Sequence, residues 1–130
     1  MEQLSHSEEQ VMVALWDCGR PATRREIAAC LPESCRWADT TLLNFLARLA
    51  GKGFVRPSKQ GNRNLYTPLV RKQTYCGATS ATHLQRLYGG DARAMFAALT
   101  DTGRISFAAL ERLARYLDTR AAESPEYDYD

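Results

Sequence analysis

The most constraining feature of the sequence is a change in the period of its apolar residues near residue 54. Before this point, four apolar side chains recur at i, i+3, i+4 and i+7, the spacing that places them on one face of a helix. They are Leu42, Phe45, Leu46 and Leu49. After it, residues 54–58 and 63–68 have strand-like composition, and the polar residues 59–62 between them are typical of a turn. The pattern predicts a helix followed directly by a β-hairpin.

Two shorter helices are predicted before this one. Each begins with a capping box of the S/T-x-x-E type, at Ser5–Glu8 and at Thr23–Glu26. We expect the third helix to begin near Asp39, whose carboxylate can accept hydrogen bonds from the free amides of the first turn. Three helices and a hairpin wing predict a mainly α fold with a small β-hairpin, a winged helix-turn-helix domain, over residues 1–70.

From residue 71 the sequence is helical again, in three short segments with apolar stripes. Helices this short cannot bury their apolar faces alone, so a second copy of the chain is the expected partner. We therefore predict a helical dimerisation region over residues 71–120 and an acidic, disordered tail over residues 121–130. The predicted dimer interface consists of Leu84, Leu87, Tyr88, Met95, Phe96, Leu99, Phe107, Leu110, Leu113 and Leu117.

Charge is divided unevenly along the 130 residues. Residues 1–73 hold 11 Lys and Arg against 7 Asp and Glu, whereas residues 74–130 hold 6 against 8. A basic first half suits an anion-binding domain, and the acidic second half suits self-association. The chain has no apolar run of the roughly 18–20 residues that span a bilayer, and its first residues do not resemble a signal peptide, so we expect a cytoplasmic protein.

The four cysteines do not form a C-x-x-C pair, and the chain has two histidines, His6 and His83, to assist them. The favoured interpretation is four free thiols in a reducing compartment rather than a metal site or disulfides. They are Cys18, Cys30, Cys35 and Cys76. No cofactor or metal is expected.

The face of the third helix opposite its apolar stripe is short, polar and almost uncharged, and it is centred on Thr40, Asn44 and Ala47. Solvated helix faces usually contain Glu and Lys, so this composition favours contact with duplex DNA. Asn can bond an adenine edge, and Leu43 or a Thr methyl can contact a thymine methyl. Thr40 and Thr41 lie in the first turn, where hydroxyls and amides can hold a phosphate.

Arginine and lysine side chains near this face are further candidates. Lys59 and Arg63, on the hairpin, are placed for phosphates or the minor groove, and Thr23, which starts the second helix, completes the predicted set. For Arg48 two interpretations stay open, a DNA contact and an ion pair with an acid of the first helix, such as Glu8 or Glu9.

The order and spacing of several short motifs are similar to those of the penicillinase-repressor family of winged-helix transcriptional regulators (BlaI, MecI and CopY type), from Leu4 to about Thr119. The motifs are Leu4-Ser5 with Glu9 and Trp16, Pro21-Ala22-Thr23-Arg24-Arg25-Glu26-Ile27, Trp37-Ala38-Asp39-Thr40-Thr41, Leu46-Ala47-Arg48-Leu49, Lys52-Gly53, Gly61-Asn62-Arg63 and Tyr66-Thr67-Pro68-Leu69-Val70.

The resemblance implies a homodimer that represses antibiotic-response genes of the β-lactamase type, or related stress genes, by binding a dyad-symmetric operator. It implies DNA contacts at Thr40, Thr41, Leu43 and Asn44, with the wing at Arg63. It also implies a sensor protease as an inducing partner, but Ala98-Leu99 stands where the family is cut at Asn-Phe, which disfavours that route. The paired Cys-x-Cys motifs of the copper-responsive branch are absent from the sequence.

Three other functions were weighed. An enzyme is disfavoured because the sequence has no Gly-rich phosphate loop and no Ser/His/Asp arrangement. A winged-helix module that binds proteins rather than DNA is an alternative, because a fold does not fix a function. A thiol-responsive or metal-responsive repressor is another, with Cys30, Cys35 or Cys76 as the sensing residue.

Overall fold

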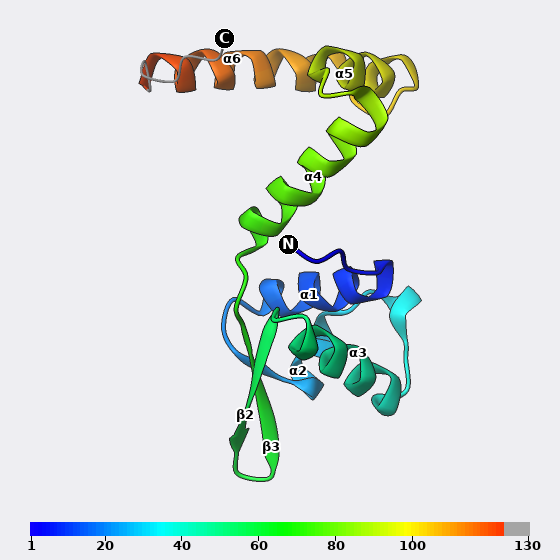
Figure 1. Cartoon of the computed structure of the whole chain (residues 1–130), viewed down its shortest axis with the longest axis vertical. Helices are drawn as coiled ribbons and strands as arrows, with labels where there is room; N and C mark the ends of the chain where they lie inside the picture. The colour runs from blue at the N-terminus through cyan, green and yellow to red at the C-terminus, as the bar shows by residue number, and fades with distance from the viewer. Residues whose placement is uncertain (124–130) are drawn as a thin grey trace. The chain divides into compact units, whose positions relative to one another are not determined.

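The computed structural model describes residues 1–123 and divides the chain into two compact units, residues 1–80 and 81–130. Six α-helices, one short 3-10 helix and three strands follow one another along the described residues (Figure 1). Residues 121–123 belong to the last helix, although the sequence places them in the disordered tail. The rest of that predicted tail, residues 124–130, lies outside the described residues.

Local sequence signals determine where the first two helices begin. In α1 (His6–Cys18), the Ser5 hydroxyl accepts from the amide of Glu8, and the Glu8 carboxylate accepts from the amide of Ser5. The same reciprocal cap precedes α2 (Arg24–Cys30), between Thr23 and Glu26. Both capping boxes predicted from the sequence are therefore present, and each satisfies two amides that the helix leaves without partners.

The third helix begins where the sequence predicts, but its cap is different. In α3 (Asp39–Gly51) the N-cap residue is Ala38, which offers no side-chain hydrogen bond. The prediction that Asp39 caps the helix is wrong, because Asp39 is already the first helical residue and its carboxylate accepts from Arg24 instead. A one-turn 3-10 helix, η1 (Glu33–Cys35), lies between α2 and α3.

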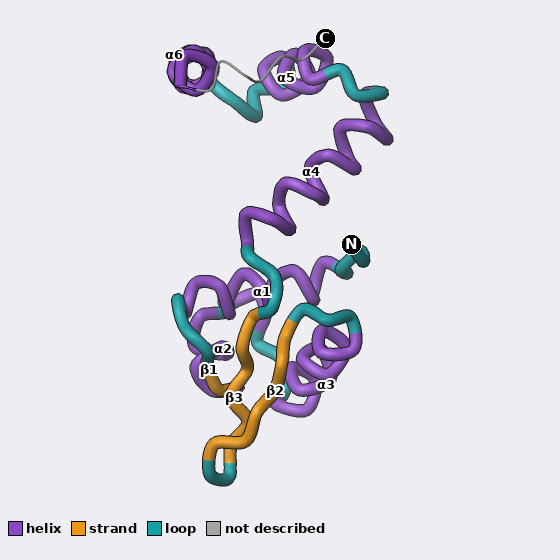
Figure 2. The backbone as a smooth tube through the Cα atoms, turned by 60° about the vertical axis from the view of Figure 1, so that its left-hand side comes forward, coloured by secondary structure: helices purple, strands orange, loops and turns teal. Residues whose placement is uncertain are grey.

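The hairpin is longer than predicted, and a third strand joins it. Strands β2 (Val55–Gln60) and β3 (Arg63–Pro68) are antiparallel, and a two-residue turn with Gly61 at φ 65° connects them. The two-residue strand β1 (Ala22–Thr23) pairs with β3, so the strand order is β1-β3-β2 (Figure 2). Its register places Ala22 opposite Tyr66, which ties the start of α2 to the base of the wing.

One apolar core holds the three helices and the sheet together. Each helix contributes side chains on one face, and the hairpin closes the core with its first and last residues. The buried apolar residues are Leu4, Val11, Met12, Ala14, Leu15, Ala22, Ile27, Cys35, Leu42, Leu46, Leu49, Phe54, Val55, Tyr66 and Tyr75.

The first part of α4 (Lys72–Tyr88) belongs to this core. Tyr75 is buried against the rings of Phe54 and Trp16, and its hydroxyl donates to the Glu9 carboxylate. Burial, and then the hydrogen bond to Glu9, raise the pKa of Tyr75 to about 12. Trp16 Nε1 also donates to the carbonyl of Val70 across 2.9 Å. These contacts fix the start of α4, where the sequence alone predicts a weak helix.

The second unit contains the end of α4, then α5 (Ala92–Asp101) and α6 (Phe107–Glu123). The Asp91 carboxylate caps α5, and the Ser106 hydroxyl accepts from the amide of Ala109 at the start of α6. Neither α5 nor α6 has a buried residue in the single chain. No helix of the described residues is long and apolar enough to cross a membrane.

Candidate nucleic-acid interface

The outward face of α3 has the composition of a surface that contacts a partner. Leu42, Leu46 and Leu49 are buried on the opposite side, where they fix the rotation of the helix. The face turned outward is formed by Thr40, Leu43, Asn44, Ala47 and Arg48, all exposed, with Thr41 half-buried beside them. The periodicity of the sequence therefore predicts correctly which side chains of α3 face outward.

Arg48 is held by an aromatic ring rather than by an acid. Its guanidinium lies 5.8 Å from the centroid of the Phe45 ring. The predicted pairing with Glu8 or Glu9 is wrong, because those carboxylates are bound elsewhere, Glu8 by Lys52 at 2.7 Å and Glu9 by the Tyr75 hydroxyl. Since no acid neutralises it in an ion pair among the described residues, Arg48 keeps its charge at the edge of the α3 face.

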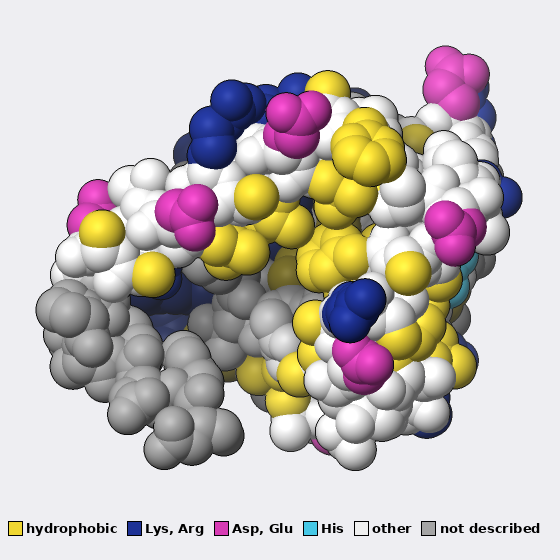
Figure 3. Space-filling view, turned by 90° about the horizontal axis from the view of Figure 1, so that it is seen from above, with side chains coloured by type: hydrophobic (Ala, Val, Ile, Leu, Met, Phe, Trp, Pro, Cys, Tyr) yellow, Lys and Arg dark blue, Asp and Glu magenta, His cyan; other side chains and the backbone are white. Residues whose placement is uncertain are grey.

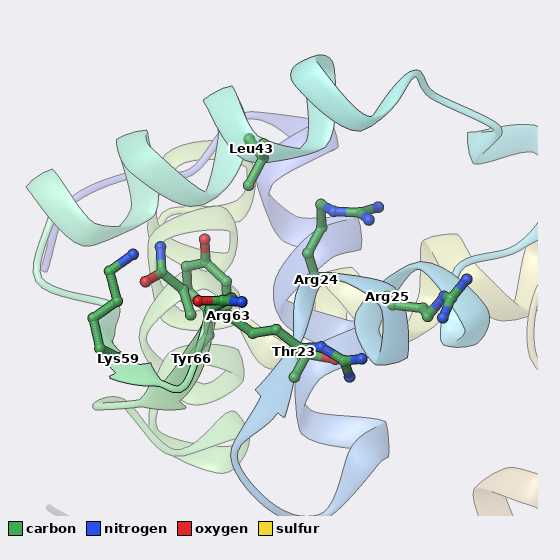
Figure 4. Close-up of a pocket in the computed structure, with 9 residues that line it drawn as sticks. Thr23, Arg24, Arg25, Leu43, Lys59, Arg63 and Tyr66 are labelled. Atoms are coloured by element: carbon green, nitrogen blue, oxygen red, sulfur yellow. The ribbon is translucent and has the colours of Figure 1, made fainter.

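A pocket of about 370 Å³ opens beside this face, between α2, α3 and the hairpin (Figure 4). Leu43 projects into it from α3, and Lys59 and Arg63 border it from the hairpin (Figure 4). Its lining contains four cationic side chains and not one carboxylate, so the pocket favours an anion. The lining residues are Thr23, Arg24, Arg25, Leu43, Lys59, Asn62, Arg63, Asn64 and Tyr66.

Several of these residues are missed by the sequence-based prediction. Arg24 and Arg25 lie within the capping box of α2, between Thr23 and Glu26, and nothing in a linear sequence indicates that they share a pocket with the hairpin. Pairing of Ala22 and Thr23 with β3 brings them there. The sequence signal that could identify these residues is a pair of arginines at a helix start. The free amides of a first helical turn also attract anions, so the arginines and the amides favour the same kind of ligand.

Arg25 and Arg63 contribute to a second hollow as well. Arg20 and Glu26 also line it, and Gln60 and Leu65 contribute from the hairpin. Glu26 is already paired, because the Arg20 guanidinium lies 2.8 Å from its carboxylate. The hydrogen bond from Arg20, followed by the one from the amide of Thr23, lowers the pKa of Glu26 to about 2. Arg25 and Arg63 are thus the cationic side chains that line both hollows.

Thr23 has a structural function in addition to its position in the pocket. Its hydroxyl accepts from the amide of Glu26 at 3.3 Å and donates to the Glu26 carboxylate at 3.2 Å. The hydroxyl is therefore satisfied within the chain.

The residues predicted to form a dimer interface lie on the three C-terminal helices. Leu87, Phe107 and Leu117 are exposed, at 65%, 75% and 53% of their surface. Hydrophobic side chains are visible over these helices in the space-filling view (Figure 3). The other seven are half-buried: Leu84, Tyr88, Met95, Phe96, Leu99, Leu110 and Leu113.

Among residues 1–123, no three His, Cys, Asp or Glu side chains are grouped so that they could hold a metal ion.

Three packed helices, of which the third has an open polar face, and a β-hairpin beside them define a winged helix-turn-helix domain of the DNA-binding type. A family model described as penicillinase repressor matches residues 4–119, nearly the whole chain. The chain belongs to the penicillinase repressor family. It is accordingly a transcriptional repressor of the DNA-binding kind and not an enzyme.

Individual relatives are distant but extend over most of the chain. The penicillinase repressor of Bacillus licheniformis is 27% identical over 116 residues, which cover 89% of this chain and 90% of that protein. An uncharacterised 16.5 kDa protein of Latilactobacillus sakei is 28% identical over 124 residues, covering 95% and 84%. The solved DNA-binding domain of the repressor BlaI is 29% identical, with a TM-score of 0.49, over 56% of this chain and 88% of that one.

Proposed function

We propose that this repressor binds a dyad-symmetric operator as a homodimer, with α3 in the major groove of each half-site. The supporting observation is the placement of the outward face of α3, with Thr40 and Asn44, beside a pocket that four cationic side chains line. A polar face can bond base edges, and cations at its border can bond the flanking phosphates. A combination of base-edge contacts and phosphate contacts is typical of sequence-specific DNA binding.

Each side chain of the surface has a role in this proposal. Asn44 and Leu43 contact base edges, with Thr40 and Thr41 near the phosphate at the start of α3. Arg24 and Arg25 contact the backbone that borders the half-site. Lys59 and Arg63 contact the backbone or the minor groove beside it, where a narrow hairpin can reach.

The C-terminal helices provide the second half of the proposal. Leu87, Phe107 and Leu117 present apolar surface that a monomer leaves in water. Covering it with a second copy removes that cost and places two recognition helices on one duplex, as a dyad-symmetric site requires. Residues 71–120 are the proposed dimerisation region, and residues 1–70 the proposed DNA-binding domain.

The regulated genes are proposed from the family relationship. A relative named as a penicillinase repressor suggests β-lactamase-type antibiotic response or a related stress response, with the protein acting in the cytoplasm. Cleavage by a sensor protease at Ala98-Leu99 is left out of the proposal, because neither residue matches the Asn-Phe pair expected for that route.

Selection of bound duplexes from a random-sequence pool, repeated at two salt concentrations, tests the proposal. The expected result is an enriched motif with two inverted half-sites about one helical turn apart, retained at the higher salt. Weak binding without a motif that collapses at higher salt would indicate charge attraction only. In that case the domain is a protein-interaction module and the proposal fails.

A further inference from the structure

The fold brings together two cysteines that are twelve positions apart. Cys18 ends α1, Cys30 ends α2, and their sulfur atoms lie 3.6 Å apart, in van der Waals contact. Cys30 is exposed and Cys18 is half-buried. The other two cysteines differ in surroundings, since Cys35 is buried and Cys76 is exposed on α4.

We infer that Cys18 and Cys30 form a modification site, a dithiol that hydroperoxides convert into a reversible intramolecular disulfide. A disulfide requires sulfur atoms at about 2.05 Å, so the two sulfurs have to approach by only about 1.6 Å. Side-chain rotation and a small shift of the helix ends supply such a movement. This site lies outside the DNA-binding surface, so the inference is independent of the proposed function.

The exposure of the two thiols assigns their roles. Cys30 is open to solvent, and its thiolate attacks one oxygen of hydrogen peroxide, so that the O–O bond breaks and a sulfenic acid forms on Cys30. The hydroxide that leaves takes up the proton that the Cys30 thiol had lost and becomes water. The Cys18 sulfur then attacks the Cys30 sulfur and the S–O bond breaks. The proton of Cys18 leaves with that oxygen as a second water. Two thiols are oxidised and one peroxide is reduced.

The surroundings of Cys18 suit the second role better than the first. Burial, and then the adjacent Cys30 thiol and the Glu26 carboxylate, raise the pKa of Cys18 to about 11. It therefore stays protonated at neutral pH and is a poor first nucleophile toward peroxide. Its contact with Cys30 still places it to capture a sulfenic acid before further oxidation to the sulfinic acid, which thiols do not reverse.

The bridge joins α2 to α1. Because α2 begins with Arg24 and Arg25 and ends at Cys30, a bond from Cys30 to α1 holds the helix that supplies two cations of the pocket. It also closes a loop in the unfolded chain, which lowers the entropy of that state. Oxidation is expected to raise the urea concentration at the unfolding midpoint.

Peptide mapping of the reduced, full-length protein tests the inference. The protein is treated with one equivalent of hydrogen peroxide, alkylated at low pH and cleaved after glutamate. Cleavage after Glu9, Glu26 and Glu33 puts Cys18 in peptide 10–26, Cys30 in peptide 27–33, and Cys35 in a separate peptide. The expected product is peptide 10–26 linked to peptide 27–33, which dithiothreitol separates.

Two variants sharpen the test. Cys76→Ser removes an exposed cysteine that has no part in the site and should give the same linked peptides. With two or more equivalents of peroxide, Cys18→Ser should leave Cys30 to proceed to the sulfinic acid, with no linked peptide. Full alkylation of Cys18 in peroxide-treated wild type, with Cys30 as sulfinic acid, would overturn the inference. A disulfide that joins two copies through Cys76, in place of the internal one, would overturn it as well.

Discussion

Arg24 Nη1 donates to Asp39 Oδ1 across 2.8 Å, so an ion pair joins the first turn of α2 to the first turn of α3. Asp39 is largely exposed, and its partner Arg24 is one of the residues that line the cationic pocket. In free protein the pair neutralises one of the four cations that the pocket presents. It therefore acts against DNA binding while it contributes to the packing of α2 on α3.

Asp39→Asn is expected to tighten DNA binding. The change frees Arg24 for a phosphate, so affinity should rise on the order of tenfold at low salt, for operator and non-specific duplexes alike. Because exposed ion pairs stabilise weakly, the free energy of unfolding should change by less than about 1 kcal/mol. Fluorescence anisotropy over a salt series, beside urea unfolding, measures both. Glu33→Gln, which removes an acid from the exposed pair with Arg36, is the matched control.

Asn44→Ala is expected to weaken operator binding and to relax the preference at a single base position. An amide side chain that bonds a base edge through two hydrogen bonds discriminates by about 1–3 kcal/mol. Competition between duplexes that differ at one position measures this preference. Gln73→Ala, an exposed amide on α4, is the control. Unchanged base preference in Asn44→Ala would mean that α3 does not read the operator.

Arg63→Ala should act differently, because a phosphate contact contains no sequence information. Affinity should fall by a similar factor for all duplexes, and the slope of log K against log salt should become shallower by about one. Arg25→Ala, in the same pocket, is expected to behave in the same way. Arg112→Ala removes the same charge from α6 and should leave the slope unchanged. Loss of base preference in Arg63→Ala would contradict the assignment to phosphate.

Features with local causes could be predicted from the sequence. Capping boxes at Ser5 and Thr23 give two helix starts, and the apolar period gives the outward face of α3. Strand β1 could not be predicted, because two residues become a strand only by pairing with Leu65 and Tyr66 far along the chain. The hairpin exceeds its predicted length because Gly61 allows a two-residue turn.

The sequence predicts the face of α3, because its residues share one helix, and it predicts Lys59 and Arg63 as cations of the hairpin. These two hairpin residues line the pocket. Arg24 and Arg25 were missed because the pocket is formed by three elements that meet in the fold. Likewise, of the two interpretations left open for Arg48, an ion pair with Glu8 is not formed, because Lys52, which caps the C-terminus of α3 four residues later, binds that carboxylate. Periodicity alone cannot choose between two cations one turn apart.

The Glu8–Lys52 pair gives the protein a dependence on acid pH. Glu8 is almost fully buried, which by itself raises its pKa, but Lys52 and the cap hydrogen bonds of Ser5 reverse the shift, so the net pKa lies below the ordinary value of 4.5. A lowered pKa in the folded state stabilises the protein above 4.5, and this stability is lost as the pH falls through the lower, folded-state pKa. The lowered pKa of Glu26, about 2, acts in the same direction.

Glu8→Gln is the change that tests this dependence. It keeps the shape of the capping side chain but leaves Lys52 without its charge partner, so unfolding at pH 7 should require about 1–3 kcal/mol less free energy. The decline of stability between pH 5 and pH 3 should also become shallower. Urea unfolding at several pH values measures both effects. Glu2→Gln removes an exposed carboxyl and should change neither; an unaltered decline in Glu8→Gln would contradict the role of Glu8.

Phe107→Glu combined with Leu117→Glu is expected to separate the proposed dimer. Two charges on the apolar face of α6 would have to be buried in the interface, so sedimentation equilibrium should show monomers where the wild type shows dimers. Affinity for a full operator should fall by about 10²-fold or more, because linked half-site binding is lost, while affinity for an isolated half-site stays the same. Thr119→Glu places the same charge about 160° around α6 from Leu117 and should leave both properties intact. If the double variant remains dimeric, the dimer interface lies elsewhere. If its affinity for an isolated half-site falls, α6 supports the DNA-binding domain directly.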